Sequence, residues 1–185
     1  MIDRYTSGER ILHWVTAITF LLLAASGLAF FPPSMYWMAN LLGGGTWARI
    51  LHPFIGVVMF VAFILMALKF WHHNVLSGND RKWLGQIGDV IANRDDRVPP
   101  IGRYNPGQKI LFWVLLASMI VLLVSGIALW RPYFAPAFGI GTIRFGALMH
   151  ALSALALILL TMASSWCASA SSMAWRKARF LARSR

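Results

Sequence analysis

Three of the five histidines lie near the ends of long apolar segments, at His13, His52 and His150. An ionisable side chain inside a bilayer is costly, so it is read first as part of a functional site. Each neutral imidazole offers one ring nitrogen to a metal, and two imidazoles on facing helices can clamp a haem iron from both sides. The pattern therefore favours a haem held between helices. The plainer alternative is a set of unrelated histidines at the membrane surface.

The elements that must position these histidines are membrane-spanning helices. The chain is 58% hydrophobic and only 12% charged, with a mean hydropathy of +0.63, whereas soluble domains average about 25% charged residues. Four apolar segments, approximately 11–31, 52–70, 108–130 and 143–162, are long enough to cross a bilayer. The first is too long and too aromatic for a signal peptide. We predict an all-α membrane protein, a bundle of four transmembrane helices whose domain covers residues 1–163.

The net charge is +11, and the basic residues are concentrated in alternate segments between the spans. Basic residues gather before the first span, between spans two and three, and after the last span, namely at Arg4, Arg10, Arg81, Lys82, Arg94, Arg97, Arg103, Arg176, Lys177, Arg179, Arg183 and Arg185. This alternation is the positive-inside pattern. It predicts that both termini and the 71–107 connection are cytoplasmic, and it argues against a nucleic-acid partner.

The helix boundaries carry local signals. Residues 6–9 read as a capping box that starts the first helix, and the Asn-Pro-Gly at 105–107 reads as the turn that starts the third. Pro53 is expected in the first turn of the second helix, which leaves His52 at the outer edge. Beyond four spans of similar length, no internal repeat is expected.

The 71–107 connection is predicted to contain a short amphipathic helix on the inner membrane surface. Its apolar residues recur at helical spacing, at Trp83, Ile87, Val90 and Ile91.

Topology sorts the histidines into an outer pair and an inner single residue. His52 and His150 fall in the outer half of the membrane, and His13 falls at the inner edge, roughly 30 Å away across the bilayer core. A partner for His13 on the fourth helix is expected fourteen residues after His150, about 21 Å further in and on the same face. That position is Ser164, a poor iron ligand. His72, His73 and Met162 are the less favoured alternatives.

Other metal centres fit the sequence poorly. The single Cys167 excludes an internal disulfide and an iron–sulfur cluster held by this chain alone. No CxxCH motif is present, so a covalently attached c-type haem is excluded. No acidic residue lies within an expected span, which argues against a four-ligand zinc site.

The motifs together resemble the gamma subunit, the cytochrome b556 subunit, of respiratory membrane-bound formate dehydrogenases, over roughly residues 3–162. The resemblance rests on Arg-Tyr-Thr-x-x-Glu-Arg-Ile-x-His-Trp at 4–14, Arg-Ile-Leu-His-Pro-Phe-x-Gly-Val at 49–57, Trp-His-His-Asn at 71–74, Gly-Arg-Tyr-Asn-x-Gly-Gln-Lys at 102–109 and Trp-Arg-Pro-Tyr-Phe-Ala-Pro at 130–136. Such motifs are far more specific than four spans with histidines.

The resemblance implies two b haems and a quinone site in the bacterial inner membrane. The outer haem would be held by His52 and His150, and the inner one by His13 and a histidine at position 164. Asn105 and Gly107 match residues that bind quinone beside the inner haem. Electrons would come from an iron–sulfur beta subunit, and through it from a catalytic alpha subunit, and would reduce quinone. This chain would not itself oxidise formate.

The sequence departs from the family at its end. Residues 164–185 form a basic, Ser-rich tail that is expected to be cytoplasmic and is atypical for the family, and a frameshift after Met162 is one explanation. Ser164 predicts one well-bound haem instead of two. The alternatives are a cytochrome b subunit of another respiratory complex such as a hydrogenase, a haem-deficient membrane anchor, and a small-molecule transporter. The lack of carboxylates in the spans argues against a proton-coupled transporter.

Overall fold

The computed structural model describes residues 6–86, 88, 104–131 and 133–183, with side chains up to residue 165. Its helices are α1 (Ser7–Ala29), α2 (Gly45–Phe70), α3 (Gly78–Gly85), α5 (Pro106–Leu129) and α6 (Ile140–Arg183), with short 3-10 helices η1 (Pro33–Leu42), η2 (Trp71–His73) and η4 (Ala135–Ala137). The described residues contain no strand. Four of the helices are long and apolar enough to cross a membrane, so the predicted all-α, four-span fold is confirmed.

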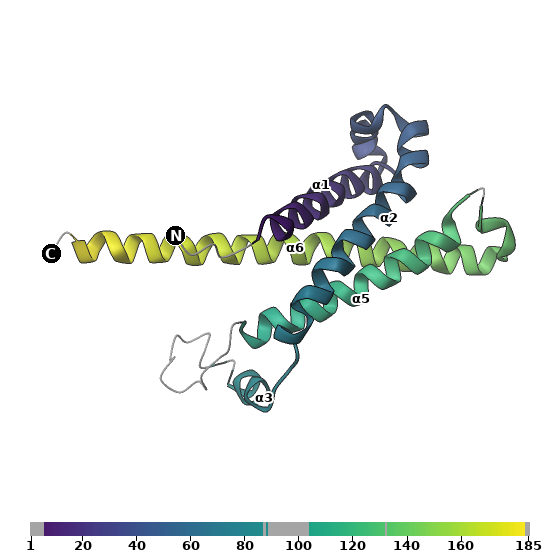
Figure 1. Ribbon diagram of the computed structural model, residues 1–185. Helices are drawn as coiled ribbons and strands as arrows, with labels where there is room; N and C mark the ends of the chain where they lie inside the picture. Colours follow the sequence, from purple (N-terminus) through teal and green to yellow (C-terminus); the bar gives the residue numbers. More distant parts are fainter. Residues whose placement is uncertain (1–5, 87, 89–103, 132, 184–185) are drawn as a thin grey trace.

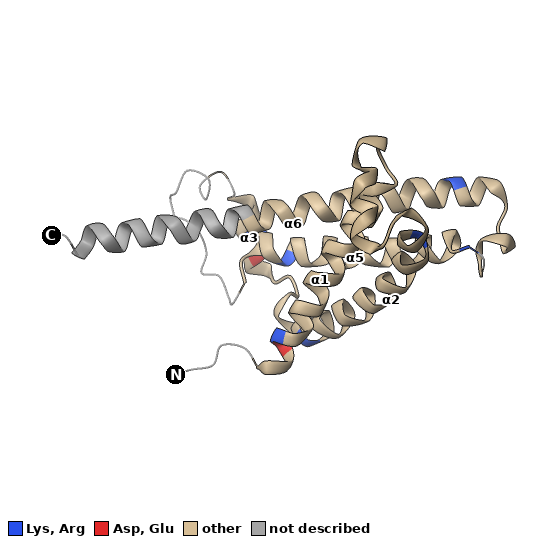
Figure 2. Ribbon diagram, turned by 90° about the horizontal axis from the view of Figure 1, so that it is seen from above, with Lys and Arg blue, Asp and Glu red and all other residues tan. Residues whose placement is uncertain are grey.

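The long helices form two hairpins that cross each other (Figure 1). α1 packs mainly on α2, and α5 packs mainly on α6. The helices α1 and α5 begin at the end of the bundle where α3 also lies, and we call this the N-cap end. The connections that contain η1 and η4 lie at the opposite end, which we call the turn end (Figures 1 and 2). An even number of spans therefore returns the chain to the end where it starts.

A small apolar core joins the two hairpins. Met59, Met119 and Leu157 come from α2, α5 and α6, and Phe20 and Leu23 of α1 pack against them. The outer faces of the same helices expose large apolar side chains. Charged residues gather toward the two ends of the bundle (Figure 2). This distribution is the one expected for helices whose outer faces contact lipid acyl chains.

The start of α1 is fixed by the predicted capping box. The Thr6 hydroxyl accepts from the Glu9 backbone N–H at 3.4 Å, and the Glu9 carboxylate accepts from the Thr6 N–H at 2.7 Å. Glu9 also pairs with Lys69 at 3.1 Å, which ties the start of α1 to the end of α2.

The start of α2 differs from the prediction. Gly43 and Gly44 adopt φ values of +83° and +97°, a conformation that glycine reaches without steric cost, and the helix begins directly after them at Gly45. The prediction that Pro53 lies in the first turn is therefore wrong, because Pro53 lies inside the helix. These two glycines allow the helix to start earlier than the predicted span at 52–70. His52 consequently projects from the body of α2 rather than from its first turn.

The connection after α2 contains the expected short helix. In α3, Ser77 and Asp80 form a second capping box, and Trp83 lies within the helix. Ile87, Val90 and Ile91, which were predicted to continue it, lie outside the described residues.

The connection is fastened to the start of α5 by polar contacts. Asp80 Oδ2 accepts from Lys109 Nζ at 2.8 Å, and the same ammonium donates to the Val75 carbonyl at 3.1 Å. The indole N–H of Trp113 donates to the Asn74 carbonyl at 3.0 Å. These contacts set the position of α3 relative to the first turns of α5.

Candidate functional site

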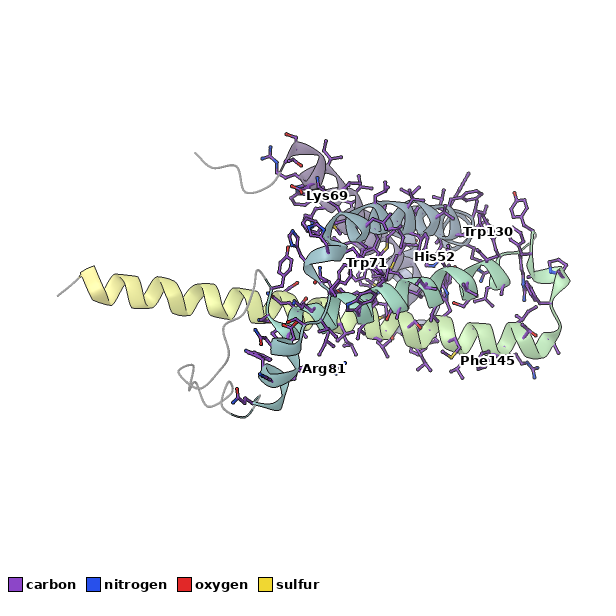
Figure 3. All side chains as sticks on the ribbon, turned by 60° about the horizontal axis from the view of Figure 1, so that its bottom comes forward. His52, Lys69, Trp71, Arg81, Trp130 and Phe145 are labelled. Carbon is purple, nitrogen blue, oxygen red and sulfur yellow. The ribbon has the colours of Figure 1, made fainter. Side chains whose placement is uncertain are left out.

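The structure brings His52 and His150 together. His52 lies on α2 and His150 on α6, and their ring centres are 6.3 Å apart with an interplanar angle of 60°. Both rings are half-buried. His52 lies within the bundle, between Trp71 toward the N-cap end and Trp130 toward the turn end (Figure 3). The two residues are 98 positions apart in the chain, so only the crossing of the hairpins places them side by side.

Each ring is contacted by a serine from the other helix of its own hairpin. Ser26 Oγ on α1 lies 2.7 Å from His52 Nδ1, and Ser125 Oγ on α5 lies 3.0 Å from His150 Nδ1. The serines are buried, with exposed fractions of 1% and 7%. In both rings the serine oxygen contacts Nδ1.

A glycine follows each serine and lies against the histidine ring. A β-carbon at Gly27 would lie 3.8 Å from His52 Cε1, and one at Gly126 would lie 3.3 Å from His150 Cε1. The first distance is an ordinary contact, and the second would push the His150 ring away. The glycine at 126 is therefore needed for the position of His150.

These serines reveal an internal repeat, and the expectation of no repeat is wrong. Arg-Tyr-Thr-Ser-Gly-Glu-Arg-Ile-Leu-His-Trp-Val at 4–15 matches Arg-Tyr-Asn-Pro-Gly-Gln-Lys-Ile-Leu-Phe-Trp-Val at 103–114. At the same offset, Ser-Gly-Leu-Ala at 26–29 matches Ser-Gly-Ile-Ala at 125–128. The repeat equates α1 with α5, and the two hairpins with each other. Sequence reasoning missed the serines because it searched only for metal ligands, although the repeated Ser-Gly dipeptide was visible.

The paired rings fit a metal clamped between them. Metal–nitrogen bonds to histidine are about 2 Å long. Two such bonds on opposite sides of one metal, together with the distance from each nitrogen to its ring centre, place the ring centres roughly 6 Å apart. The observed 6.3 Å matches that separation. Two histidine imidazoles are the donor set of a six-coordinate haem iron, so the residues present fit a b haem.

His13 is not part of a comparable pair. It is exposed at the start of α1, and its ring packs against Trp14 at 6.0 Å. In the repeat, its counterpart on α5 is Phe112. Among the side chains described, no second histidine contacts His13.

The other residues considered as partners of His13 make contacts elsewhere or are exposed. The hydroxyl of Ser164 donates to the Thr161 carbonyl at 2.9 Å, and Met162 is exposed. The rings of His72 and His73 contact each other in η2, with ring centres 3.8 Å apart and an interplanar angle of 47°.

Asn105 and Gly107 lie at the start of α5. Asn105 is the N-cap residue, and its Oδ1 accepts from the Gln108 backbone N–H at 2.8 Å. In turn, the Gln108 side-chain oxygen accepts from the Asn105 backbone N–H at 3.1 Å. The predicted helix-start turn is therefore confirmed. Capping uses the oxygen of the Asn105 amide, and Gly107 is exposed in the first turn, where backbone N–H groups have no acceptor within the helix.

The chain belongs to the prokaryotic cytochrome b561 family, whose family model matches residues 4–163. It is similar to the cytochrome b556(fdo) subunit of formate dehydrogenase from Escherichia coli (strain K12), with 49% identity over 87% of this chain and 75% of that subunit. The cytochrome b556(Fdn) subunit of the nitrate-inducible formate dehydrogenase of the same strain is 40% identical over 85% of this chain and 73% of that subunit. A formate dehydrogenase cytochrome b556 subunit from Haemophilus influenzae is 42% identical over 83% of this chain and 64% of that subunit.

These relatives confirm the resemblance inferred from the motifs. Membership of a cytochrome b family implies haem b as the cofactor. With four apolar helices, the chain is a multi-pass protein of the bacterial inner membrane.

Proposed function

We propose that this chain is the cytochrome b subunit of a formate dehydrogenase and that His52 and His150 are the axial ligands of its b haem. The observation that carries the proposal is the 6.3 Å separation of the two rings, in a chain whose relatives are named as cytochrome b556 subunits. A b haem bound there supplies one-electron redox chemistry, and the protein supplies its binding and orientation.

The proposed topology places the turn end on the outer side. The basic residues of the N-cap end favour the cytoplasmic side, so both termini would be cytoplasmic. The partners would be an iron–sulfur subunit docked at the turn end and, through it, a catalytic subunit that oxidises formate. In this arrangement the His52–His150 pair, which lies toward the turn end, is the ligand pair nearer to that partner.

The proposed second substrate is quinone at the start of α5. Reduction of a quinone to a quinol takes up two electrons and two protons, so the site needs hydrogen-bond donors at the carbonyl oxygens. Because the cap uses Asn105 Oδ1, the Nδ2 group remains as a donor. The exposed Gly107 N–H is a second donor from the first helical turn.

Replacing Asn105 by Asp tests the quinone site. Aspartate caps a helix as well as asparagine does, so the start of α5 is retained while the amide donor is lost. A neutral hydrogen bond contributes about 1 kcal/mol, and the carboxylate also repels a carbonyl oxygen. We expect quinol-driven haem reduction to fall about tenfold or more. The control is Thr6→Asp, which places an aspartate at the repeat-related cap of α1. Equal, unchanged rates in both variants would remove Asn105 from the site.

A haem-free membrane anchor is the second candidate, favoured by Ser164 at the position where the family's inner ligand is expected. An optical spectrum of the purified protein separates the two functions. Dithionite-reducible b-type bands are expected of the cytochrome, and their absence would leave the anchor.

A further inference from the structure

We infer that Ser26 and Ser125 are positioning residues that fix the tautomer and the orientation of His52 and His150. The inference rests on the proposed function, because it concerns the ligands of the proposed haem. It adds two residues from the helices that carry no outer ligand, so that all four spans contribute to the outer site.

The direction of each hydrogen bond follows from the number of hydrogens. Ser26 Oγ lies 2.8 Å from the Leu22 carbonyl oxygen and 3.2 Å from that of Leu23. A carbonyl oxygen has no hydrogen to give, so the single hydroxyl hydrogen of Ser26 is used there. The 2.7 Å contact with His52 Nδ1 must then use a hydrogen on the ring. His52 is therefore the Nδ1–H tautomer, with its lone pair on Nε2.

The same geometry recurs in the second hairpin. Ser125 Oγ lies 2.6 Å from the Val121 carbonyl and 3.4 Å from that of Leu122, so it also accepts from His150 Nδ1 at 3.0 Å. The repeat placed the same Ser-Gly dipeptide behind both rings. The same contact between a serine oxygen and Nδ1 therefore occurs in both hairpins.

The serines act through the rings and not on the iron. A ligating histidine that donates its second N–H to an acceptor is held in one orientation and becomes a stronger electron donor. Without the serine oxygen, the ring N–H loses this acceptor and the ring is less firmly held in one orientation. Among the residues described, no hydroxyl contacts His13, so that histidine lacks the support that both outer ligands have.

Removing the hydroxyls tests the inference on the purified holoprotein. In Ser26→Ala and Ser125→Ala we expect haem affinity to fall about 10- to 100-fold, the usual effect of losing such a partner. We also expect the midpoint potential of the remaining haem to rise, because a weaker donor stabilises ferric iron less. The low-spin ferric EPR signal should broaden as the rings reorient. Ser26→Ala should have the larger effect, since Ser26 is more buried and its contact is shorter.

Matched controls separate this role from general helix stability. Thr19 on α1 bonds helix carbonyls at 2.6 and 3.1 Å without contacting a histidine, and Ser118 on α5 is a half-buried serine of the same helix as Ser125. Thr19→Val and Ser118→Ala should leave affinity, potential and EPR signal unchanged, and Ser26→Thr should restore the wild-type values.

The outcomes distinguish the two proposals. If the serine variants behave like these controls, the role of the serines is overturned. If His52→Ala still loses the haem in that case, the proposed ligands remain intact. A wild-type protein without haem would overturn the proposed function itself.

Discussion

Replacing either His52 or His150 by alanine is expected to reduce the b haem content at least tenfold. Each substitution removes one of two axial bonds and opens a void beside the remaining ring, which lies 6.3 Å away in the intact pair. The measurement is the haem-to-protein ratio of the purified chain from its absorbance spectrum. Folding is checked by helical circular dichroism, which should not change, because the apolar contacts of Met59, Met119 and Leu157 remain.

His72→Ala is the matched control for the loss of an imidazole. His72 lies in η2, where its ring contacts His73, away from the proposed ligand pair, so its removal should leave the haem content at the wild-type level. Full haem content in His52→Ala, or equal losses in all three variants, would contradict the assignment of His52 and His150 as ligands.

The second large effect is expected at the buried ion pair that fastens α3 to α5. Lys109→Met removes the ammonium group that contacts Asp80 Oδ2 at 2.8 Å. Asp80 is only 4% exposed, so its carboxylate would keep only the Ser77 contacts at 2.6 and 2.8 Å. A hydrogen bond to a charged group contributes about 2 kcal/mol. We expect a loss of that size in the free energy of unfolding, and faster amide hydrogen exchange in residues 78–85.

The size of this effect depends on pH in a defined way. The hydrogen bond from Lys109 lowers the pKa of Asp80 below its usual value of 3.8. The pair therefore stabilises the fold fully at pH values above the usual pKa of aspartate, and this stabilisation is lost as the pH falls through the lowered pKa. The difference between wild type and Lys109→Met should be constant from neutral pH down to about 5 and should shrink below 4.

Lys69→Met is the control for the loss of a lysine at the same end of the bundle. Lys69 pairs with Glu9, but its side chain is 49% exposed, and exposed ion pairs contribute only about 0.2–1 kcal/mol. If Lys109→Met lowers the free energy of unfolding no more than Lys69→Met does, the Asp80 contact does not hold α3 against α5.

The spans and helix caps could be predicted because their signals are local. Apolar length identified all four membrane helices, and the spacing of Thr6 and Glu9 identified the first cap. The start of α2 could not be predicted in the same way. It depends on the left-handed conformation of Gly43 and Gly44, and a run of glycines is equally typical of a loop.

The histidine pair was accessible from sequence because topology alone assigns His52 and His150 to one side of the membrane. Their serine partners were harder to find. Ser26 and Ser125 lie in apolar helices where a serine usually bonds only its own helix, and their second contact depends on how the hairpin packs. The repeat gives the missing signal, since the same dipeptide occurs at the same offset in both hairpins.

The internal repeat also sharpens the question of the inner haem. The outer histidines lie on the second helix of each hairpin and are contacted by repeat-related serines, whereas His13 corresponds to Phe112 and its expected partner is Ser164. The two halves of the chain thus offer a complete site near the turn end and a single histidine near the N-cap end.

The haem count per chain tests this account most directly. A pyridine haemochrome assay on the purified protein, referred to its amino-acid content, should give one b haem. That haem should persist in His13→Ala and disappear in His52→Ala. Two haems per chain, one of which is lost in His13→Ala, would contradict the account by showing that a ligand other than a histidine at position 164 completes an inner site.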